Sequence, residues 1–292
     1  MSTIFNISDK IKLANYTPSL LNFYGGAAGA YSLRKLDVFY SGSAVRVRRA
    51  SDNTEQDIAF ANNELDTATL ETFASGTDAF VTTWYDQSGN EKNVTQYYAS
   101  KQPKIVSSGS TILKFGKPAI EFNDTTSTTL KLTNYNGADF VDGPCFVTSV
   151  SSYTGLGSDQ YGTIWHIGMS GSPNKIIANK YVQTSNQVTL GKYDSGYLFR
   201  RGGSVSPNTQ YINTLDYNGG LDVSFYNNNV LFSSTTGLSA DLSNNFVIGG
   251  GGADGFNWML DGHIQEVILY NNSQSSNRTN IETNINDFYS IY

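Results

Sequence analysis

The segment FVTTWYDQSGN, from Phe80 to Asn90, joins a strand-like run to a polar turn. Its first half is rich in β-branched and aromatic residues, which favours a strand, and its second half consists of turn formers. The side chains at the junction are Trp84, Tyr85, Asp86 and Gln87. Aromatic rings beside a carboxylate and an amide suit a sugar site, where a ring stacks and hydroxyls form hydrogen bonds. The same combination equally suits a buried polar corner that holds two sheets together.

Structural roles compete with chemical ones for the acidic residues of this region. Asp86 follows an apolar strand, and we favour a role in which it accepts hydrogen bonds from turn amides or from Arg48. Asp52 and Asp57 are expected to fix turns and arginines in the same way. Hydrolysis of a glycoside needs two carboxylates separated by about 5 to 9.5 Å. The carboxylates available in principle are Asp86, Glu91, Glu121, Asp254, Asp261 and Glu266.

The histidines and the last of these carboxylates have simple structural interpretations. His166 lies in the apolar run TIWHI, which favours a core histidine with a satisfied hydrogen bond. His263 follows Asp261-Gly262 and is expected to be exposed. Glu266 alternates with Val267 on a strand near the C-terminus, so we expect it on a solvated face.

A glycine-rich loop near the C-terminus, GGADGFNWMLDG, carries a tryptophan among polar residues, where an aromatic has less reason to be in the core. Such a loop could stack a sugar ring, contact a neighbouring subunit or bind Ca²⁺. The carbohydrate-binding candidates are Trp258, Asn257, Asp254, Asp261 and Phe256. Calcium takes about 6 to 8 oxygen ligands, and this loop offers only three such side chains. We therefore expect no cofactor, with calcium kept as an alternative.

Composition limits the classes of function. The chain has 292 residues, 15% charged residues and a net charge of −6, and it lacks the basic runs that neutralise phosphates, which argues against nucleic-acid binding. The one cysteine, Cys145, is expected to be a buried thiol, and with two histidines no metal site is predicted. No apolar run approaches the ~20 residues of a membrane helix. The N-terminus lacks signal-peptide features, so we expect synthesis in a cytoplasm without export.

Hydrophobic patterns predict an all-β fold. Strand-like segments recur with glycine, asparagine and serine between them, which indicates a two-sheet antiparallel β-sandwich with a few short helices. Helices are expected at 66–74 and at a closing segment that contains Arg278 and is capped near Ser275-Ser276, and a weak one in 27–35. We divide the chain into an N-terminal attachment segment, 1–24, and one sandwich domain, 25–292.

Two resemblances follow from particular motifs. The segment from Leu260 to Tyr270, LDGHIQEVILY, with the glycine loop before it and the helix after it, resembles the end of laminin G-like, concanavalin A-like lectin domains. The region from about Tyr31 to Phe122 resembles the catalytic domain of the α-L-arabinofuranosidase B family. Its matching pieces are VRVRRASDNTEQDI, the helix ending at Phe73, TTWYDQSGNEKNV and, more loosely, GKPAIEF. The resemblance implies a concanavalin A-like jelly roll and a history of handling sugars.

The sequence also departs from the enzyme family. That family carries adjacent paired cysteines and then a nucleophilic glutamate just after the matching region. Here only Cys145 is present, and there is no aspartate or glutamate between Gln160 and Tyr193. We therefore expect no catalytic residue and no enzymatic activity. On this interpretation Trp84 and Tyr85 are largely buried, and Asp86 and Gln87 hold a corner between strands.

Similar modules occur in bacteriophage tail and virion proteins. The favoured function is accordingly a non-catalytic carbohydrate-binding or adhesion module of a phage virion, in a tail, fibre or capsid-decoration protein. Its expected partners are host-surface glycans, other virion proteins and further copies of the chain, and its expected location is the virion. One alternative is a purely structural virion subunit that uses the sandwich for assembly. A second alternative is a glycosidase of the arabinofuranosidase type.

Overall fold

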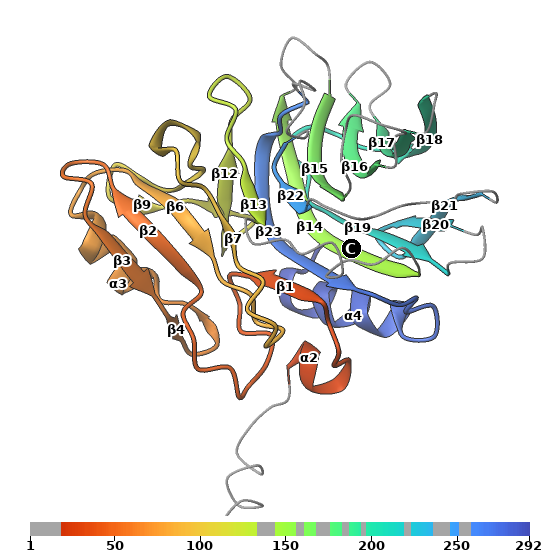
Figure 1. Cartoon of the computed structure of the whole chain (residues 1–292), viewed down its shortest axis with the longest axis horizontal. Coiled ribbons are helices and arrows are strands. Elements are labelled where there is room, and N and C mark those ends of the chain that lie inside the picture. Colours follow the sequence, from red (N-terminus) through yellow and green to blue (C-terminus); the bar gives the residue numbers. More distant parts are fainter. Residues whose placement is uncertain are drawn as a thin grey trace, which may run out of the picture.

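The computed structural model describes residues 19–132, 144–155, 161–167, 176–182, 187–193, 197–218, 223–235, 246–250 and 258–292. Throughout this part of the chain, strands dominate and pair antiparallel, with a few short helices at the periphery (Figure 1). The expected two-sheet antiparallel β-sandwich is therefore confirmed. No helix in the described ranges is long and apolar enough to cross a membrane.

The first sheet has the strand order β21-β20-β19-β14-β23-β1. Its strands are β1 (Gly29–Ser32), β14 (Cys145–Gly155), β19 (Tyr211–Tyr217), β20 (Val223–Asn227), β21 (Val230–Thr235) and β23 (Asp261–Tyr270). The second sheet has the order β13-β22-β15-β16-β17-β18. Its strands are β13 (Leu130–Leu132), β15 (Tyr161–Ile167), β16 (Ile176–Val182), β17 (Gln187–Tyr193), β18 (Tyr197–Ser204) and β22 (Phe246–Ile248).

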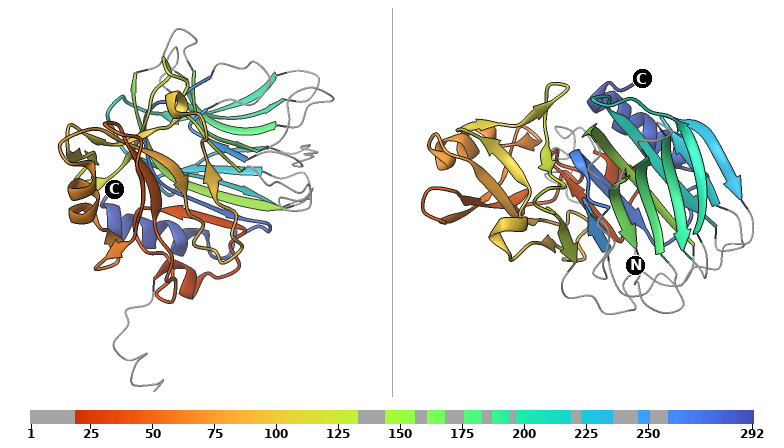
Figure 2. Two further views of the ribbon diagram at one scale, coloured as in Figure 1. Left: turned by 60° about the vertical axis from the view of Figure 1, so that its left-hand side comes forward. Right: turned by 90° about the horizontal axis from the view of Figure 1, so that it is seen from above.

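A lobe built by the N-terminal half joins both sheets at one side (Figure 2). Its strands are β2 (Val45–Arg49), β3 (Glu55–Ile58), β6 (Ala79–Trp84), β7 (Val94–Thr95), β8 (Lys104–Ser107), β9 (Ser110–Thr111) and β12 (Ile120–Phe122). β12 pairs with β23 of the first sheet, and β7 pairs with β13 of the second. Two small hairpins are added by β4 (Phe60–Ala61) with β5 (Glu64–Leu65) and by β10 (Leu113–Lys114) with β11 (Lys117–Pro118).

The helices begin and end for identifiable reasons. In α3 (Thr67–Ala74), Asp66 caps the first turn by accepting a hydrogen bond from the Thr69 N–H at 3.0 Å, and Leu70 and Phe73 are buried. The helix expected at 66–74 is therefore confirmed. A 3-10 turn, η1 (Ala99–Lys101), lies between β7 and β8.

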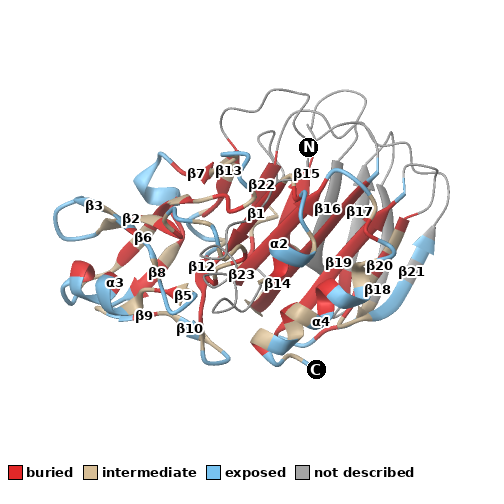
Figure 3. Ribbon diagram, turned by 90° about the horizontal axis from the view of Figure 1, so that it is seen from below, coloured by how far each residue is buried: buried red, intermediate tan, exposed pale blue. Residues whose placement is uncertain are grey.

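The outer face of the first sheet is covered by α2 (Leu20–Phe23) and α4 (Arg278–Tyr289). Ile281 and Ile285 of α4 pack with Leu20 and with residues of β14 and β23 in a second apolar cluster. The expected closing helix is confirmed, although its N-cap is Asn277 rather than Ser275 or Ser276. Figure 3 shows buried strands such as β14, β19 and β23, and the more exposed rim of the N-terminal lobe.

The weak helix expected in 27–35 is wrong, because residues 29–32 form β1. Gly29 to Ser32 pair with Leu269 to Glu266 of β23, and all four β1 residues are buried. Local helix propensity differs by less than 1 kcal/mol among most residues, so pairing with a buried strand overrides it. Tertiary pairing therefore decides this segment.

The corner formed by residues 84–87 follows β6 in the chain and is hydrogen-bonded to Ala30 of β1. Trp84 is fully buried, whereas Tyr85 is only half-buried, so the expectation that both are largely buried is wrong for Tyr85. Asp86 is buried and accepts hydrogen bonds from the N–H groups of Ala30 (2.8 Å) and Lys92 (3.0 Å). It also accepts hydrogen bonds from the Ser88 N–H and hydroxyl. Every partner of this carboxylate is thus close in the turn or on the neighbouring strand.

Gln87 completes the corner. Its Oε1 accepts a hydrogen bond from the Leu36 N–H at 2.7 Å, and its Nε2 donates to the carbonyl oxygens of Ser32 and Arg34 at 3.0 Å. Arg48, by contrast, donates to Gln102 and Asn53 and has no bond to Asp86.

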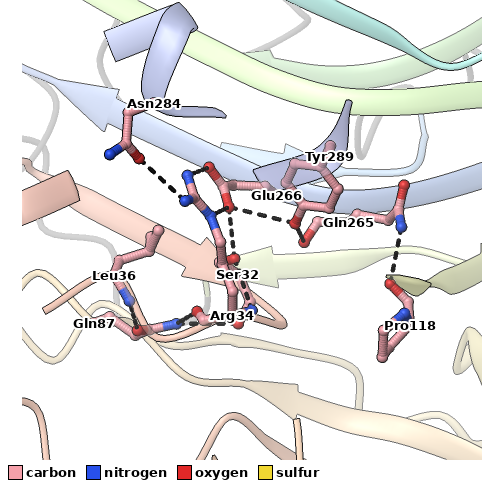
Figure 4. Close-up of polar contacts among 9 residues, drawn as sticks. All are labelled: Ser32, Arg34, Leu36, Gln87, Pro118, Gln265, Glu266, Asn284 and Tyr289. Carbon is pink, nitrogen blue, oxygen red and sulfur yellow. Dashed lines mark hydrogen bonds and ion pairs between the residues drawn. The ribbon is translucent and has the colours of Figure 1, made fainter. Parts of the chain in front are cut away.

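Glu266 is fully buried, so the expected solvated face is wrong (Figure 4). Its carboxylate accepts from Arg34 Nε at 2.7 Å and Arg34 Nη2 at 3.0 Å, and from the Ser32 hydroxyl at 2.7 Å. Arg34 also donates to Asn284 of α4 at 3.1 Å. The cause is the cover that α4 places over this face of β23. The network ties the N-terminal segment, the first sheet and the last helix together.

Candidate functional site

A cleft of about 420 Å³ opens on the outer surface where β8 and β12 meet the 3-10 turn η1. We call it the Glu121 cleft. It is lined by Phe80, Ala99, Ser100, Gln102, Lys104, Glu121, Asn123, Thr126 and Thr128. The lining combines one aromatic ring, two charged side chains and several amides and hydroxyls, which suits a polyhydroxyl ligand with an apolar face.

Strand pairing sets the order of the side chains in this cleft. Lys104 of β8, Glu121 of β12 and His263 of β23 lie directly opposite one another in register. Ile120 and Phe122, which flank Glu121 in the sequence, are fully buried in the core, so alternation along the strand turns Glu121 to the outer face. Residues separated by more than 140 positions are thereby brought into one row.

His263 lies next to Glu121, with Nε2 3.7 Å from the Glu121 carboxylate, a distance beyond a direct hydrogen bond. The imidazole is buried, so the expectation of an exposed His263 is wrong. Burial lowers the pKa of His263, which keeps the ring neutral at pH 7. Its Nδ1 is buried without a hydrogen-bond partner within the described segments.

Contact with His263, with nearby Lys104 and Lys114, lowers the pKa of Glu121. The side chain of Glu121 is 41% exposed. Glu121 is therefore an accessible carboxylate that remains ionised in mildly acidic solution.

Asp261 begins β23 two residues before His263, and alternation places it on the same face. The carboxylate is thus a diagonal neighbour of Glu121, and such Cα pairs are typically about 7 to 8 Å apart. Burial raises the pKa of Asp261, and the negative charges of Asp124 and Glu121 raise it further. Two neighbouring carboxyls therefore have pKa values displaced in opposite directions.

The ring of Phe80 forms an apolar wall of the cleft. Arg48 lies with its guanidinium carbon 5.0 Å from the ring centroid, and the Lys104 ammonium lies 5.8 Å from it. Lys104 also pairs with Asp78 at 2.8 Å, and Arg48 donates to Gln102 at 2.7 Å. These contacts hold Phe80 and Lys104 in place before any ligand binds.

An ionised carboxylate beside a carboxyl of raised pKa is the arrangement that general acid–base chemistry requires. One group can donate a proton to a leaving oxygen, while the other attacks the reacting carbon or activates a water molecule. No group of histidine, cysteine, aspartate and glutamate side chains within the described part of the chain is arranged to hold a metal ion.

The structure describes only some of the residues that were expected to bind carbohydrate. Asn257, Asp254 and Phe256 lie outside the described residues. Trp258 is half-buried, and its ring lies 5.5 Å from that of Tyr161 on β15. Among the described members of this set, Asp261 belongs to the Glu121 face.

The remaining expected residues have structural partners. Asp52 pairs with Arg49 at 2.6 Å and accepts a hydrogen bond from the Thr54 N–H at 3.0 Å. His166 is buried, with Nδ1 2.9 Å from the Gly250 carbonyl oxygen. Cys145 is buried in the core. The sequence signal for the site was the single acidic residue in the apolar run of β12, Glu121, but its partners could not be read without the strand register.

The N-terminal part, residues 25–116, matches the family model described as "Alpha-L-arabinofuranosidase B, catalytic". This match supports the resemblance drawn from the sequence motifs. No curated protein sequence matches the chain.

Solved structures extend the likeness of fold beyond that region. One is a GH54 α-L-arabinofuranosidase soaked with a cyclic sulfate inhibitor, which is 17% identical with a TM-score of 0.66. A second is an arabinofuranosidase complexed with arabinofuranosyl-α-1,2-xylobiose, which is 16% identical with a TM-score of 0.67. In both cases the match covers 89% of this chain and 62% of the other. A Trypanosoma rangeli sialidase in complex with DANA is 15% identical over 69% of this chain and 30% of that one, with a TM-score of 0.51.

These matches correct our expectation about function. We expected a non-catalytic adhesion module of a phage virion and no enzymatic activity. The matched family model describes a catalytic domain, and the similar folds are those of glycosidases, which contradicts both expectations. The criterion of a matching nucleophile between residues 160 and 193 left out carboxylates elsewhere in the chain, among them Glu121 and Asp261.

Proposed function

We propose that this chain is a glycoside hydrolase that acts on α-L-arabinofuranosides or closely related pentosides. The observation that carries the proposal is the pair formed by Glu121 and Asp261, which share one outer face and have pKa values displaced in opposite directions. The catalytic-domain match over residues 25–116 and the arabinofuranosidase-like fold support the choice of substrate class.

In the proposed reaction the sugar binds in the Glu121 cleft with one face of its ring against Phe80. Asp261, whose pKa is raised by burial, donates a proton to the leaving oxygen as the glycosidic bond breaks. Ionised Glu121 either attacks the anomeric carbon or removes a proton from the water that does so. His263 lies beside Glu121 and favours its ionised form.

The test is an assay of the purified chain with a panel of 4-nitrophenyl glycosides that includes the α-L-arabinofuranoside and several pentopyranosides and hexopyranosides. The proposal predicts release of 4-nitrophenol from the arabinofuranoside in preference to the hexosides. Absence of release from every member of the panel by folded protein, across the acidic and neutral pH range, would overturn it.

A further inference from the structure

A second hollow lies on the other side of the chain segment 94–101. Thr95 and Tyr97 of this segment line the second hollow, whereas Ala99 and Ser100 line the Glu121 cleft. We call it the Tyr97 cleft, and its volume is about 250 Å³. It is lined by Thr83, Tyr85, Glu91, Lys92, Asn93, Thr95, Tyr97 and Leu132. None of these residues belongs to the proposed hydrolytic pair.

The floor of the Tyr97 cleft is set by strand pairing. Thr83 of β6 lies opposite Thr95 of β7, and their neighbours Trp84 and Val94 are fully buried. Alternation therefore turns both threonines outward, with Tyr85 and Tyr97 each two residues further along on the same face. Because the strands are antiparallel, the two tyrosines stand at opposite ends of the threonine pair. The result is a hydroxyl floor between two aromatic rings.

The walls are held in place without a ligand. The Tyr85 hydroxyl donates to Asp57 at 2.7 Å, and Asp57 pairs with Arg46 at 3.2 Å. Burial and this contact with Asp57 raise the pKa of Tyr85 to about 12, so the phenol is neutral. On the opposite rim, the Asn93 side-chain oxygen accepts a hydrogen bond from the Asp86 N–H at 2.9 Å.

The rim loop is fixed by the buried corner. The Lys92 N–H donates to the Asp86 carboxylate at 3.0 Å, so the segment that carries Glu91, Lys92 and Asn93 has one defined position. The bond from Asp86 to the Asn93 oxygen directs the Asn93 amide nitrogen away from the corner. Because these walls are already ordered, less conformational entropy is lost when a ligand binds, which favours ligand binding in this cleft.

The chemistry of the lining selects the class of ligand. Glu91 and Lys92 carry opposite charges, so the cleft favours a neutral ligand over an anion or a cation. Hydroxyls, an amide and a carboxylate suit sugar hydroxyls, and Tyr97, which is 75% exposed, offers a ring face for the C–H groups of a sugar. The volume is below the ~300 to 1,000 Å³ of pockets for drug-sized ligands, which fits one or two sugar units.

We propose that the Tyr97 cleft is a second carbohydrate-binding site that takes a short stretch of a neutral polysaccharide. Its position beside the Glu121 cleft would keep a polymer near the hydrolytic pair. The binding itself requires only the Tyr97 cleft, so this proposal stands or falls independently of the proposed hydrolysis.

Affinity electrophoresis in native gels that contain soluble arabinan, arabinoxylan or mixed-linkage β-glucan tests the site. All proteins carry Glu121→Gln, which prevents degradation of the polymer during the run. The parent protein is expected to be retarded by at least one polymer, and Tyr97→Ala is expected to weaken the apparent affinity roughly fivefold to tenfold through loss of one stacking ring.

The matched control is Tyr98→Ala, which removes an adjacent tyrosine that is 72% exposed and does not line the cleft. Tyr98→Ala should be retarded like the parent protein, and all variants should unfold at the same temperature. The proposal is overturned if no polymer retards the folded parent, or if Tyr97→Ala and Tyr98→Ala behave alike. Failure of the glycoside assay would leave this result unaffected, which separates the two proposals.

Discussion

Glu121 Oε1 lies 3.7 Å from Nε2 of the buried His263, and the two residues face each other across the β12–β23 pair. On this outer face the pKa of Glu121 is lowered and the pKa of Asp261 is raised. The histidine side favours an ionised Glu121, while burial and neighbouring negative charges favour a protonated Asp261. Within the described part of the chain, these three residues form a surface suited to acid–base chemistry.

Removing either carboxyl should abolish most glycosidase activity. Glu121→Gln and Asp261→Asn keep the shape of each side chain but cannot attack, accept or donate a proton in the same way. We expect kcat/KM on the aryl arabinofuranoside to fall by roughly 10²- to 10⁴-fold in each variant. The control is Glu64→Gln, which should retain activity. Glu64 is a half-buried carboxylate that pairs with Lys117, and neither residue lines the Glu121 cleft. Full activity in Glu121→Gln would exclude this residue from the reaction.

The pH dependence of kcat/KM should be bell-shaped with an acidic optimum. Activity rises as Glu121 ionises, at a pKa below its ordinary value, and falls as Asp261 loses its proton, at a pKa above its ordinary value. His263→Phe removes the contact that lowers the pKa of Glu121, so the acid limb should move to higher pH while the alkaline limb moves less. An acid limb that stays in place would show that His263 does not position or tune Glu121.

Asp86→Ala should destabilise the fold strongly. The substitution leaves the N–H groups of Ala30, Ser88 and Lys92 without their acceptor at a buried corner. Each unsatisfied buried group costs about 1 to 3 kcal/mol, and we expect a total loss of roughly 3 kcal/mol after relaxation. Urea unfolding measures this loss. Asp52→Ala, at an exposed turn, is the control and should cost much less than Asp86→Ala; equal losses at the two positions would contradict the corner role.

Breaking the Arg34–Glu266 pair should be costly because both side chains are buried. Arg34→Met leaves the Glu266 carboxylate uncompensated beneath α4, and we expect a loss of about 3 to 5 kcal/mol in the free energy of unfolding. The matched substitution Arg46→Met breaks an exposed pair with Glu55 and should cost about 0 to 1 kcal/mol. Urea denaturation of both variants gives the comparison, and similar losses would refute the importance of burial.

His166 should make the fold less stable in acid. Burial lowers the pKa of His166 to about 4, below the ~6.5 of an unfolded chain. The unfolded state therefore binds more protons between these values, and the stability contributed by neutral His166 is lost as the pH falls from about 6.5 to about 4. The wild type should lose about 2 kcal/mol more than His166→Gln between pH 7 and about 4.5 in urea unfolding. Equal losses in the two proteins would contradict this linkage.

Local sequence patterns determined most of the secondary structure. Alternating apolar residues predicted the strands, and apolar residues at helical spacing predicted the helices that form at Thr67–Ala74 and Arg278–Tyr289. The turn formers of DQSGN predicted a turn after β6, and Asp86 accepts hydrogen bonds from Ser88 two residues further on. These features depend on residues close together in the chain, which is why they are readable from it.

Only the tertiary structure decided the features that depend on strand register. Residues 29–32 became a strand because β23 pairs with them, and Glu266 became buried because α4 covers its side of the sheet. Glu121, His263 and Asp261 share a face only through the β12–β23 pairing, which joins positions more than 130 residues apart. A shift of one residue in that register would place Glu121 on the opposite face from His263 and Asp261. The sequence therefore supplied the carboxyls, and the pairing of distant strands made them a site.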